Sequence, residues 1–235
     1  MFAIFKREFK SYFTSLWGYV FLAAFLIIAA YVFIMLNITY SYGGMTPFFQ
    51  QFITLVMFVL PILTMRLFAE DRKQKTDQLL FTSPVSSMGV AIGKFLSVFA
   101  VFLVGVIIML LYPLALSFYG DTPVAETMSA FVGFALFSGA ILAIGMFMSS
   151  LTESQVIAAI STYAIIITMF ILPNFVLSNI SNPVLSEVVG SISLLDHFND
   201  FTIGVLNLES LIYYASFIVV FVFLTGIIIE RRRFS

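Results

Sequence analysis

The stretch Leu16–Leu36 reads LWGYVFLAAFLIIAAYVFIML and carries no charged residue. A helix needs about 20 apolar residues to cross roughly 30 Å of hydrocarbon, so this stretch is long enough to span a membrane. Trp17 and Tyr19 lie at its start, where aromatic rings anchor a span between lipid and water. The stretch predicts a retained membrane-spanning helix, because it is too long for the apolar part of a cleavable signal peptide.

Five further segments fit the same description. They lie at about Phe52–Phe68, Phe95–Phe118, Met128–Ser149, Val156–Leu177 and Leu211–Ile229. The second span contains Pro61 and ends near Arg66. Membrane helices tolerate both, because neighbouring groups satisfy the freed carbonyl and a long basic side chain reaches the interface. We therefore expect an all-α membrane protein with six transmembrane helices.

The composition supports a lipid environment. Of the 235 residues, 61% are hydrophobic and 10% are charged, whereas soluble domains carry about 25% charged residues. Such a chain has too little charge to cover a globular surface in water. The absence of cysteine excludes disulfides and thiolate metal sites. The net charge of −1 gives no indication of a nucleic-acid partner, and we expect none.

The charges are distributed very unevenly in a six-span chain. All 11 basic residues fall on one side, and they are Lys6, Arg7, Lys10, Arg66, Arg72, Lys73, Lys75, Lys94, Arg231, Arg232 and Arg233. The other side carries only acids, namely Asp121, Glu126, Glu187, Asp196, Asp200 and Glu209. Because Lys and Arg stay in the cytoplasm, both termini and the loop 69–92 are predicted to be cytoplasmic and the loop 178–210 extracytoplasmic. Without a repeat or a boundary, residues 1–235 are expected to form one transmembrane domain.

The N-terminal segment 1–15 has the pattern of an amphipathic helix. Five apolar residues recur at spacings of three and four: Phe2, Phe5, Phe9, Phe13 and Leu16. Lys6, Arg7 and Lys10 occupy other faces, as in helices that lie in the membrane interface. Two interpretations stay open. The helix is only an anchor that sets the orientation, or it is an elbow helix whose three basic residues also contact a cytoplasmic partner.

The strongly polar loop Glu70–Ser86 reads EDRKQKTDQLLFTSPVS. Its charged start predicts a short helix with acids near the positive end of the helix dipole. Leu79, Leu80 and Phe81 then form an apolar group in water, which usually contacts a partner or the interface, and Pro84 ends the helix. Residue chemistry alone also allows an ordinary solvated loop whose basic residues set the topology.

A resemblance favours the partner-binding alternative. The run Leu63–Leu80, followed by Thr82–Val85 (TSPV) and Gly93–Phe95 (GKF), resembles the cytoplasmic loop of ABC-2 type transporter permeases, and is especially similar to their gliding-motility-associated (GldF-like) branch. The N-terminal run Phe5–Phe13 (FKREFKSYF) is similar to the opening of that branch. Two departures occur. Relatives often have Ser-Pro at the positions of Ser15-Leu16, and many permeases have Gly-Thr at the positions of Lys75-Thr76.

The resemblance implies the permease subunit of an ATP-binding cassette exporter in a bacterial or archaeal cytoplasmic membrane. Two permease subunits, identical or different, would form the membrane core above two separate ATPase subunits. This chain has no GxxxxGK[ST] loop, so we expect ATP and Mg²⁺ to be bound by the partner and this subunit to be no enzyme by itself. Residues 70–81 would form the coupling helix that contacts the ATPase, and the residues assigned to it are Glu70, Asp71, Arg72, Lys73, Thr76, Asp77, Leu79 and Leu80.

The remaining patterns weigh against other classes of protein. No charged residue lies in the middle of any predicted span, which disfavours proton- or ion-coupled transport. The same observation favours lipid-like or amphipathic cargo, and the expected substrate is lipid-like, a glycan or a peptide. The outer cluster Asp196–Asp200 around His197 has too few ligands for a metal or catalytic site, so we expect a structural role. A stripe of small residues at Ala135, Gly139 and Ala143 predicts close helix packing, inside the chain rather than between subunits. The alternative function is an ATPase-coupled membrane scaffold with a mechanical or signalling role.

Overall fold

The computed structural model describes residues 1–40, 43–75, 86–118, 123–179 and 193–233, and these form helices joined by short connections. Among the described residues, five helical segments are long and apolar enough to cross a membrane. They consist of α2 (Leu16–Phe33) with its π-helical continuation η1 (Ile34–Thr39), α3 (Thr46–Thr64) with α4 (Ala69–Lys73), α6 (Ser87–Met109) with α7 (Leu111–Ser117), α8 (Val124–Leu151) and α12 (Leu208–Arg233). The all-helical membrane fold is therefore confirmed.

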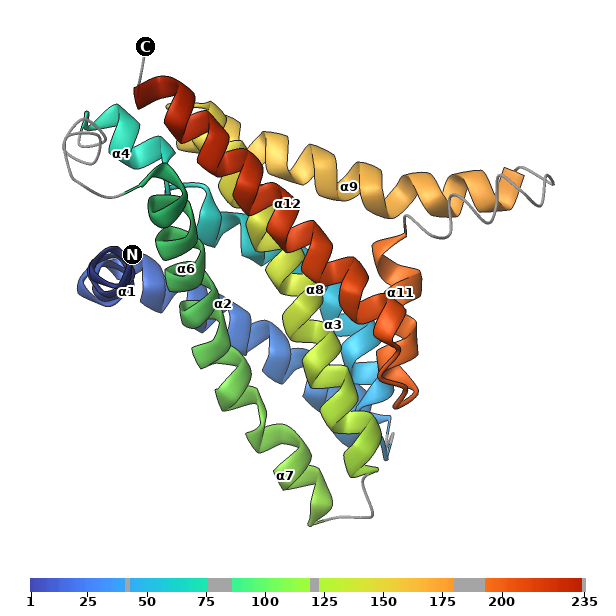
Figure 1. Cartoon of the computed structure of the whole chain (residues 1–235). Coiled ribbons are helices and arrows are strands. Elements are labelled where there is room, and N and C mark those ends of the chain that lie inside the picture. Colours follow the sequence, from blue (N-terminus) through green and yellow to red (C-terminus); the bar gives the residue numbers. More distant parts are fainter. Residues whose placement is uncertain (41–42, 76–85, 119–122, 180–192, 234–235) are drawn as a thin grey trace.

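The sixth predicted span falls on α9 (Gln155–Asn179). Most side chains of this helix beyond Phe170 lie outside the described residues, so it is not counted among the five. Figure 1 shows α9 leaving the bundle sideways near the C-terminal end of α12, whereas α3, α8 and α12 run side by side. The fold therefore carries five candidate spans among its described residues, and a membrane-crossing path for α9 stays a prediction.

The core is built around α8, which packs against α3, α6, α9, α11 and α12. Lipid tails are as apolar as leucine, so the helices associate through close packing rather than through burial from water. Phe25 of α2 is fully buried, with ring centroids 5.3 Å from Phe52 of α3 and 5.7 Å from Phe102 of α6. Phe134 of α8 completes the cluster, 5.4 Å from Phe52. Four spans thus meet at one set of aromatic rings.

Glycines of α8 allow its neighbours to approach closely. A Cβ on Gly145 would lie 2.9 Å from the Thr64 Cβ of α3, and one on Gly139 would lie 3.0 Å from the Ile218 Cδ1 of α12. Both glycines therefore face helices of the same chain. This finding supports internal packing as the role of the stripe of small residues.

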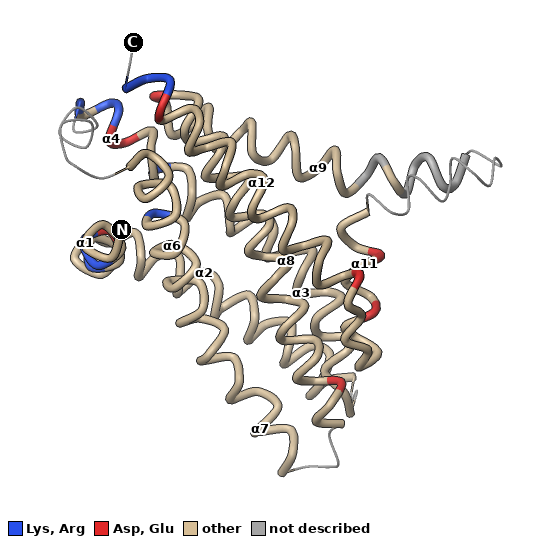
Figure 2. The backbone as a smooth tube through the Cα atoms, in the orientation of Figure 1, with Lys and Arg blue, Asp and Glu red and all other residues tan. Residues whose placement is uncertain are grey.

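One end of the bundle gathers the basic residues (Figure 2). We call it the basic end, and it comprises α1 (Phe2–Thr14), α4, the first turns of α6 and the last turn of α12. Acidic residues of α11 (Leu194–Thr202) lie toward the opposite end. The distribution agrees with the predicted sidedness, whereas the orientation of the termini in a membrane stays a prediction.

At that opposite end, the Asp196–Asp200 cluster joins α11 to α12. The Ser193 hydroxyl caps α11 by accepting a hydrogen bond from the Asp196 amide. The Ser210 Oγ donates to Asp200 Oδ2 at 3.0 Å and lies 3.2 Å from His197 Nδ1. These bonds fit the expected structural role. Most of the segment before α11, residues 180–192 of the loop 178–210, lies outside the described residues.

Candidate functional site

The short helix α4 at the basic end begins directly after the last turn of α3. Its first amide groups have no partner within the helix, as at any helix start. The Ser149 hydroxyl of α8 supplies one by accepting from the amides of Phe68 and Ala69, each at 3.1 Å, and it donates to the Met65 carbonyl at 3.0 Å. One buried hydroxyl of α8 therefore fixes both the turn and the start of α4.

The end of α4 lies at one of the two departures from the permeases that the sequence resembles. Lys75 has a φ of 56°, in the left-handed region that glycine adopts at low cost. Many permeases have glycine at this position, so this chain keeps the turn with a less suitable residue. Further along the loop, the predicted site residues Thr76, Asp77, Leu79 and Leu80 lie outside the described residues.

A buried lysine of α6 connects α4 to α1. Lys94 is 1% exposed, and its Nζ donates to Asp71 Oδ2 at 2.6 Å and to the Leu67 carbonyl at 2.6 Å. The same Nζ lies 3.4 Å from Glu8 Oε1 of α1 and 4.9 Å from the centroid of the Phe68 ring. A buried ammonium group needs such partners, because its desolvation is otherwise very unfavourable. Three segments of the basic end therefore meet at one side chain.

A second cation, Arg66, lies at the end of α3. Its Nε pairs with Glu70 Oε2 at 2.7 Å, and its guanidinium carbon lies 5.9 Å from the Tyr12 ring centroid and 5.7 Å from the Trp17 ring centroid. Nη1 donates to the Ser15 hydroxyl at 3.4 Å. Arg66 therefore binds to α4 and to the junction of α1 and α2, and its position relative to the membrane interface stays a prediction.

The helix α1 has two apolar faces with different surroundings. The rings of Phe2, Phe5, Phe9 and Phe13 follow one another with centroids 5.1–6.0 Å apart, the first three stacked and the last tilted, on exposed or partly exposed positions. This confirms the predicted stripe. A second face carries the buried residues Ile4 and Tyr12, and it packs on α6 and α3.

Tyr12 fixes this second face of α1. Its hydroxyl donates to the Leu63 carbonyl at 2.9 Å. Burial raises the pKa of the Tyr12 phenol well above its ordinary value, and the nearby Arg66 charge only partly opposes this. Tyr12 therefore stays a protonated donor at neutral pH. The predicted contact residues Lys6, Arg7 and Lys10 are exposed on α1, and Arg7 Nη2 contacts Glu8 Oε1 at 2.6 Å.

Ser15 between α1 and α2 bears on the other departure. Its φ of −101° and ψ of 161° are extended, the conformation that a residue before proline prefers. The chain therefore adopts the bend of a Ser-Pro junction with leucine as the next residue. A Cβ on Gly18 would lie 2.9 Å from the Tyr12 carbonyl carbon, so only glycine fits this tight bend. In Figure 1, α1 is seen end-on beside α6 and therefore runs across that span.

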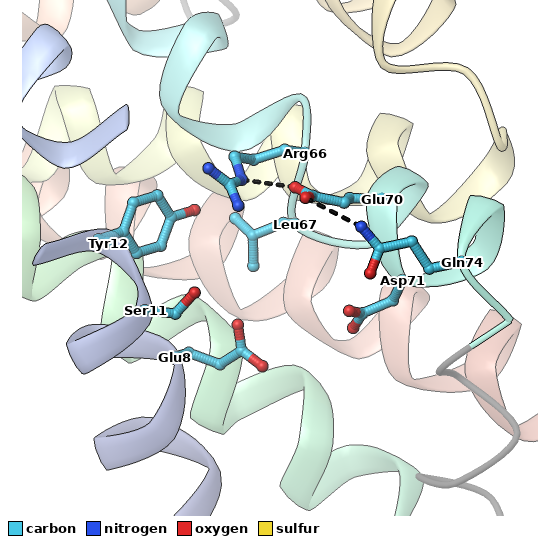
Figure 3. Close-up of a pocket in the computed structure, with 8 residues that line it drawn as sticks. All are labelled: Glu8, Ser11, Tyr12, Arg66, Leu67, Glu70, Asp71 and Gln74. Carbon is cyan, nitrogen blue, oxygen red and sulfur yellow. Dashed lines mark hydrogen bonds and ion pairs between the residues drawn. The ribbon is translucent and has the colours of Figure 1, made fainter. Parts of the chain in front are cut away.

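A polar cleft of about 140 Å³ separates α1 from α4. Figure 3 shows carboxylates from both sides directed toward it. The residues that line it are Glu8, Ser11, Tyr12, Arg66, Leu67, Glu70, Asp71 and Gln74. The two helices therefore present polar and acidic side chains to each other across the cleft.

The side chain of Arg72 in α4 contacts the end of α8 and the turn that follows it. Its Nη1 donates to the Ser150 carbonyl at 3.0 Å, and its Nη2 lies 3.6 Å from Glu153 Oε1 in the turn between α8 and α9. Of the described residues assigned to ATPase docking, Glu70, Asp71 and Arg72 thus bind within the chain, whereas Lys73 is exposed. Their role in docking stays a prediction.

Sequence reasoning missed four residues of this site, namely Glu8, Tyr12, Lys94 as a buried ion-pair partner, and Ser149. One signal was present, because Lys94 is the one basic residue within the helix α6. Its position was interpreted only as a determinant of topology. The partners lie far apart in sequence, so no local pattern connects them.

The fold and this site define a polytopic helical membrane protein whose short charged helix, α4, is fastened to three of its other helices. The family model described as "ABC-2 family transporter protein" matches residues 35–230, which is most of the chain. The chain belongs to the ABC-2 transporter family, whose members are membrane transport subunits that rely on a partner ATPase for ATP hydrolysis. No curated protein sequence matches the chain significantly. The gliding-motility-associated branch stays a prediction.

Proposed function

We propose that this chain is the permease subunit of an ATP-binding cassette exporter, and that a separate ATPase binds it at residues 70–81. Family membership supports the transport role. The position of α4 supports the coupling role, because Ser149, Lys94 and Arg72 fasten it to α8, α6 and the turn between α8 and α9. A displacement of α4 would therefore be passed to several spans at once.

The substrate class is inferred from the interior of the bundle. The segments 16–64, 95–120, 127–152 and 210–229 contain no charged residue. A pathway for a charged solute would need polar or ionisable groups at membrane depth. The proposed substrate is therefore lipid-like, with a glycan or a peptide as the less favoured choices. It would move between two permease subunits, of the same or different sequence.

The docking proposal is tested with two matched double variants of the loop. The chain is purified from its native membrane and the co-purifying ATPase is identified. The Leu79→Asp/Leu80→Asp variant should lose this ATPase, because two carboxylates replace the apolar contact. The Thr82→Asp/Ser83→Asp variant adds the same charge nearby and should retain it. Equal ATPase recovery with both variants would show that residues 79 and 80 do not form the contact.

Transport itself needs a second measurement. The complex in proteoliposomes should move a labelled lipid, glycan or peptide between leaflets or across the membrane when Mg-ATP is added. ATP hydrolysis without movement of any of these would contradict the exporter proposal. That result would favour the scaffold role instead.

A further inference from the structure

Lys94 is buried although a lysine near a membrane interface usually extends its ammonium group to water. It is 1% exposed and directs its charge inward to Asp71, the Leu67 carbonyl and Glu8. Stability alone does not require this arrangement. A buried ion pair can often be replaced by apolar residues of similar volume without loss of stability. Its presence here points to a role in positioning.

Lys94 contacts Asp71 of α4 more closely than Glu8 of α1. The 2.6 Å contact with Asp71 is a short, charge-assisted hydrogen bond to α4. The 3.4 Å contact with Glu8 is longer, and the same Glu8 oxygen also accepts from Arg7 at 2.6 Å. Lys94 is thus bound firmly to α4 and more loosely to α1.

The charges of Glu8, Lys94 and Asp71 link two helices, α1 and α4, that a polar cleft separates. The polar cleft of about 140 Å³ lies between α1 and α4, so close side-chain packing does not hold the two helices together. The Glu8–Lys94–Asp71 bridge crosses from α1 to α4 beside this cleft, by way of α6. Removing the central charge would leave α1 attached to α6 through Ile4 and to the end of α3 through Tyr12.

We propose that Lys94 is a positioning residue that makes α1 and α4 move as one unit, so that ATPase-driven displacement of α4 also moves α1. The proposal rests on the proposed function of α4 as the ATPase contact. Lys94 touches neither nucleotide nor substrate in this scheme. It sets how much of the displacement at α4 reaches the first helix and, through Ser15, the first span.

The test uses the absence of native cysteine. The substitutions Ser11→Cys and Gln74→Cys place two spin labels on opposite sides of the cleft, one on α1 and the other at the end of α4. The distance distribution is measured in the full-length permease alone, and in the ATPase complex with and without Mg-ATP and vanadate. With Lys94 present, one narrow distribution is expected in all three conditions.

The informative variant is Lys94→Met/Asp71→Asn, which removes both charges and so leaves no unpaired buried carboxylate at position 71. We expect the distribution to broaden already in the isolated permease, and to shift when ATP is bound. In proteoliposomes, the substrate moved per ATP hydrolysed should fall about fivefold or more in the single variant Lys94→Met, which changes no residue assigned to ATPase docking. Lys94→Arg should restore part of the narrow distribution, because it keeps the charge.

The control variant Arg72→Met/Glu153→Gln neutralises a pair between α4 and the α8–α9 turn, away from α1. In the isolated permease, where ATPase docking plays no part, its distance distribution across the cleft should match that of the wild type. A wild-type distribution in Lys94→Met/Asp71→Asn would overturn the proposal, whatever the thermal stability of the variant. If no ATPase docks at residues 70–81, the wild-type chain itself will fail to bind one. The distance distribution in the isolated permease does not depend on docking, so the two failures can be told apart.

Discussion

Replacing Ser149 by alanine should loosen α4 while leaving the membrane core intact. The Ser149 hydroxyl makes three hydrogen bonds to the segment 65–69, and it is fully buried. A typical intramolecular hydrogen bond contributes about 0.5–1.5 kcal/mol, so three would contribute roughly 1.5–4.5 kcal/mol. Water can reach the neighbouring Glu70, which is partly exposed, and would replace some of the lost bonds. We therefore expect a cost of about 2 kcal/mol.

This cost should appear locally in amide hydrogen exchange. At about 1.4 kcal/mol for each factor of ten, the amides of Phe68 and Ala69 should exchange roughly thirtyfold faster in Ser149→Ala. The neighbouring variant Ser150→Ala is the control, because that hydroxyl donates only to the Phe147 carbonyl within α8. It should change stability by about 0.5 kcal/mol or less. Equal exchange at positions 68 and 69 in the two variants would refute the capping role of Ser149.

Two further predictions concern packing and pH. Gly145→Ala should lower the free energy of unfolding in detergent by about 1–3 kcal/mol, because the new Cβ would lie 2.9 Å from the Thr64 Cβ of α3. A Cβ on Gly139 would meet the Ile218 Cδ1 at 3.0 Å and the edge of the Phe99 ring at 3.2 Å, which are longer contacts. Gly139→Ala should therefore shift the melting temperature less, and equal shifts would contradict this reasoning. Tyr12→Phe should cost about 1 kcal/mol at neutral pH through loss of its hydrogen bond. Because burial raises the folded pKa of Tyr12, its contribution is complete below pH about 10 and decreases as pH rises toward that pKa. Stability measured above pH 10 should therefore fall less steeply in Tyr12→Phe than in the wild type.

Five of the six predicted spans fall on helices long and apolar enough to cross a membrane, although the ends of some differ from the predictions by several residues. The first predicted span, Leu16–Leu36, begins at the observed start of α2, and helix α8 extends only slightly beyond the predicted Met128–Ser149. The second span begins at Thr46, six residues before the predicted Phe52, because its first turns are held by protein contacts rather than by hydropathy. Phe48 and Phe49 in these turns are fully buried.

The site was predictable only in outline. A short charged helix follows the second span as expected, but α4 ends at Lys73 instead of continuing to Pro84, and a coupling helix over residues 70–81 stays a prediction. The exposed basic residues of α1 lie on the expected faces. The partner of each charged side chain could not be predicted, because nothing in the local sequence distinguishes the surroundings of Glu70, Asp71 and Arg72. Their partners come from α1, α6, α8 and the α8–α9 turn, and only the relative placement of the helices decides the pairing.

The sequence by itself determined that this protein lies in a membrane, with its basic residues at one end. Long uncharged runs and the bias of Lys and Arg are properties of consecutive residues, and lipid and water act on them directly. The tertiary structure alone decided that Lys94 is buried between α1 and α4, that Ser149 caps α4, and that α9 leaves the bundle. These features depend on side chains from distant segments meeting at hydrogen-bond distance, which no hydropathy or charge pattern along the chain encodes.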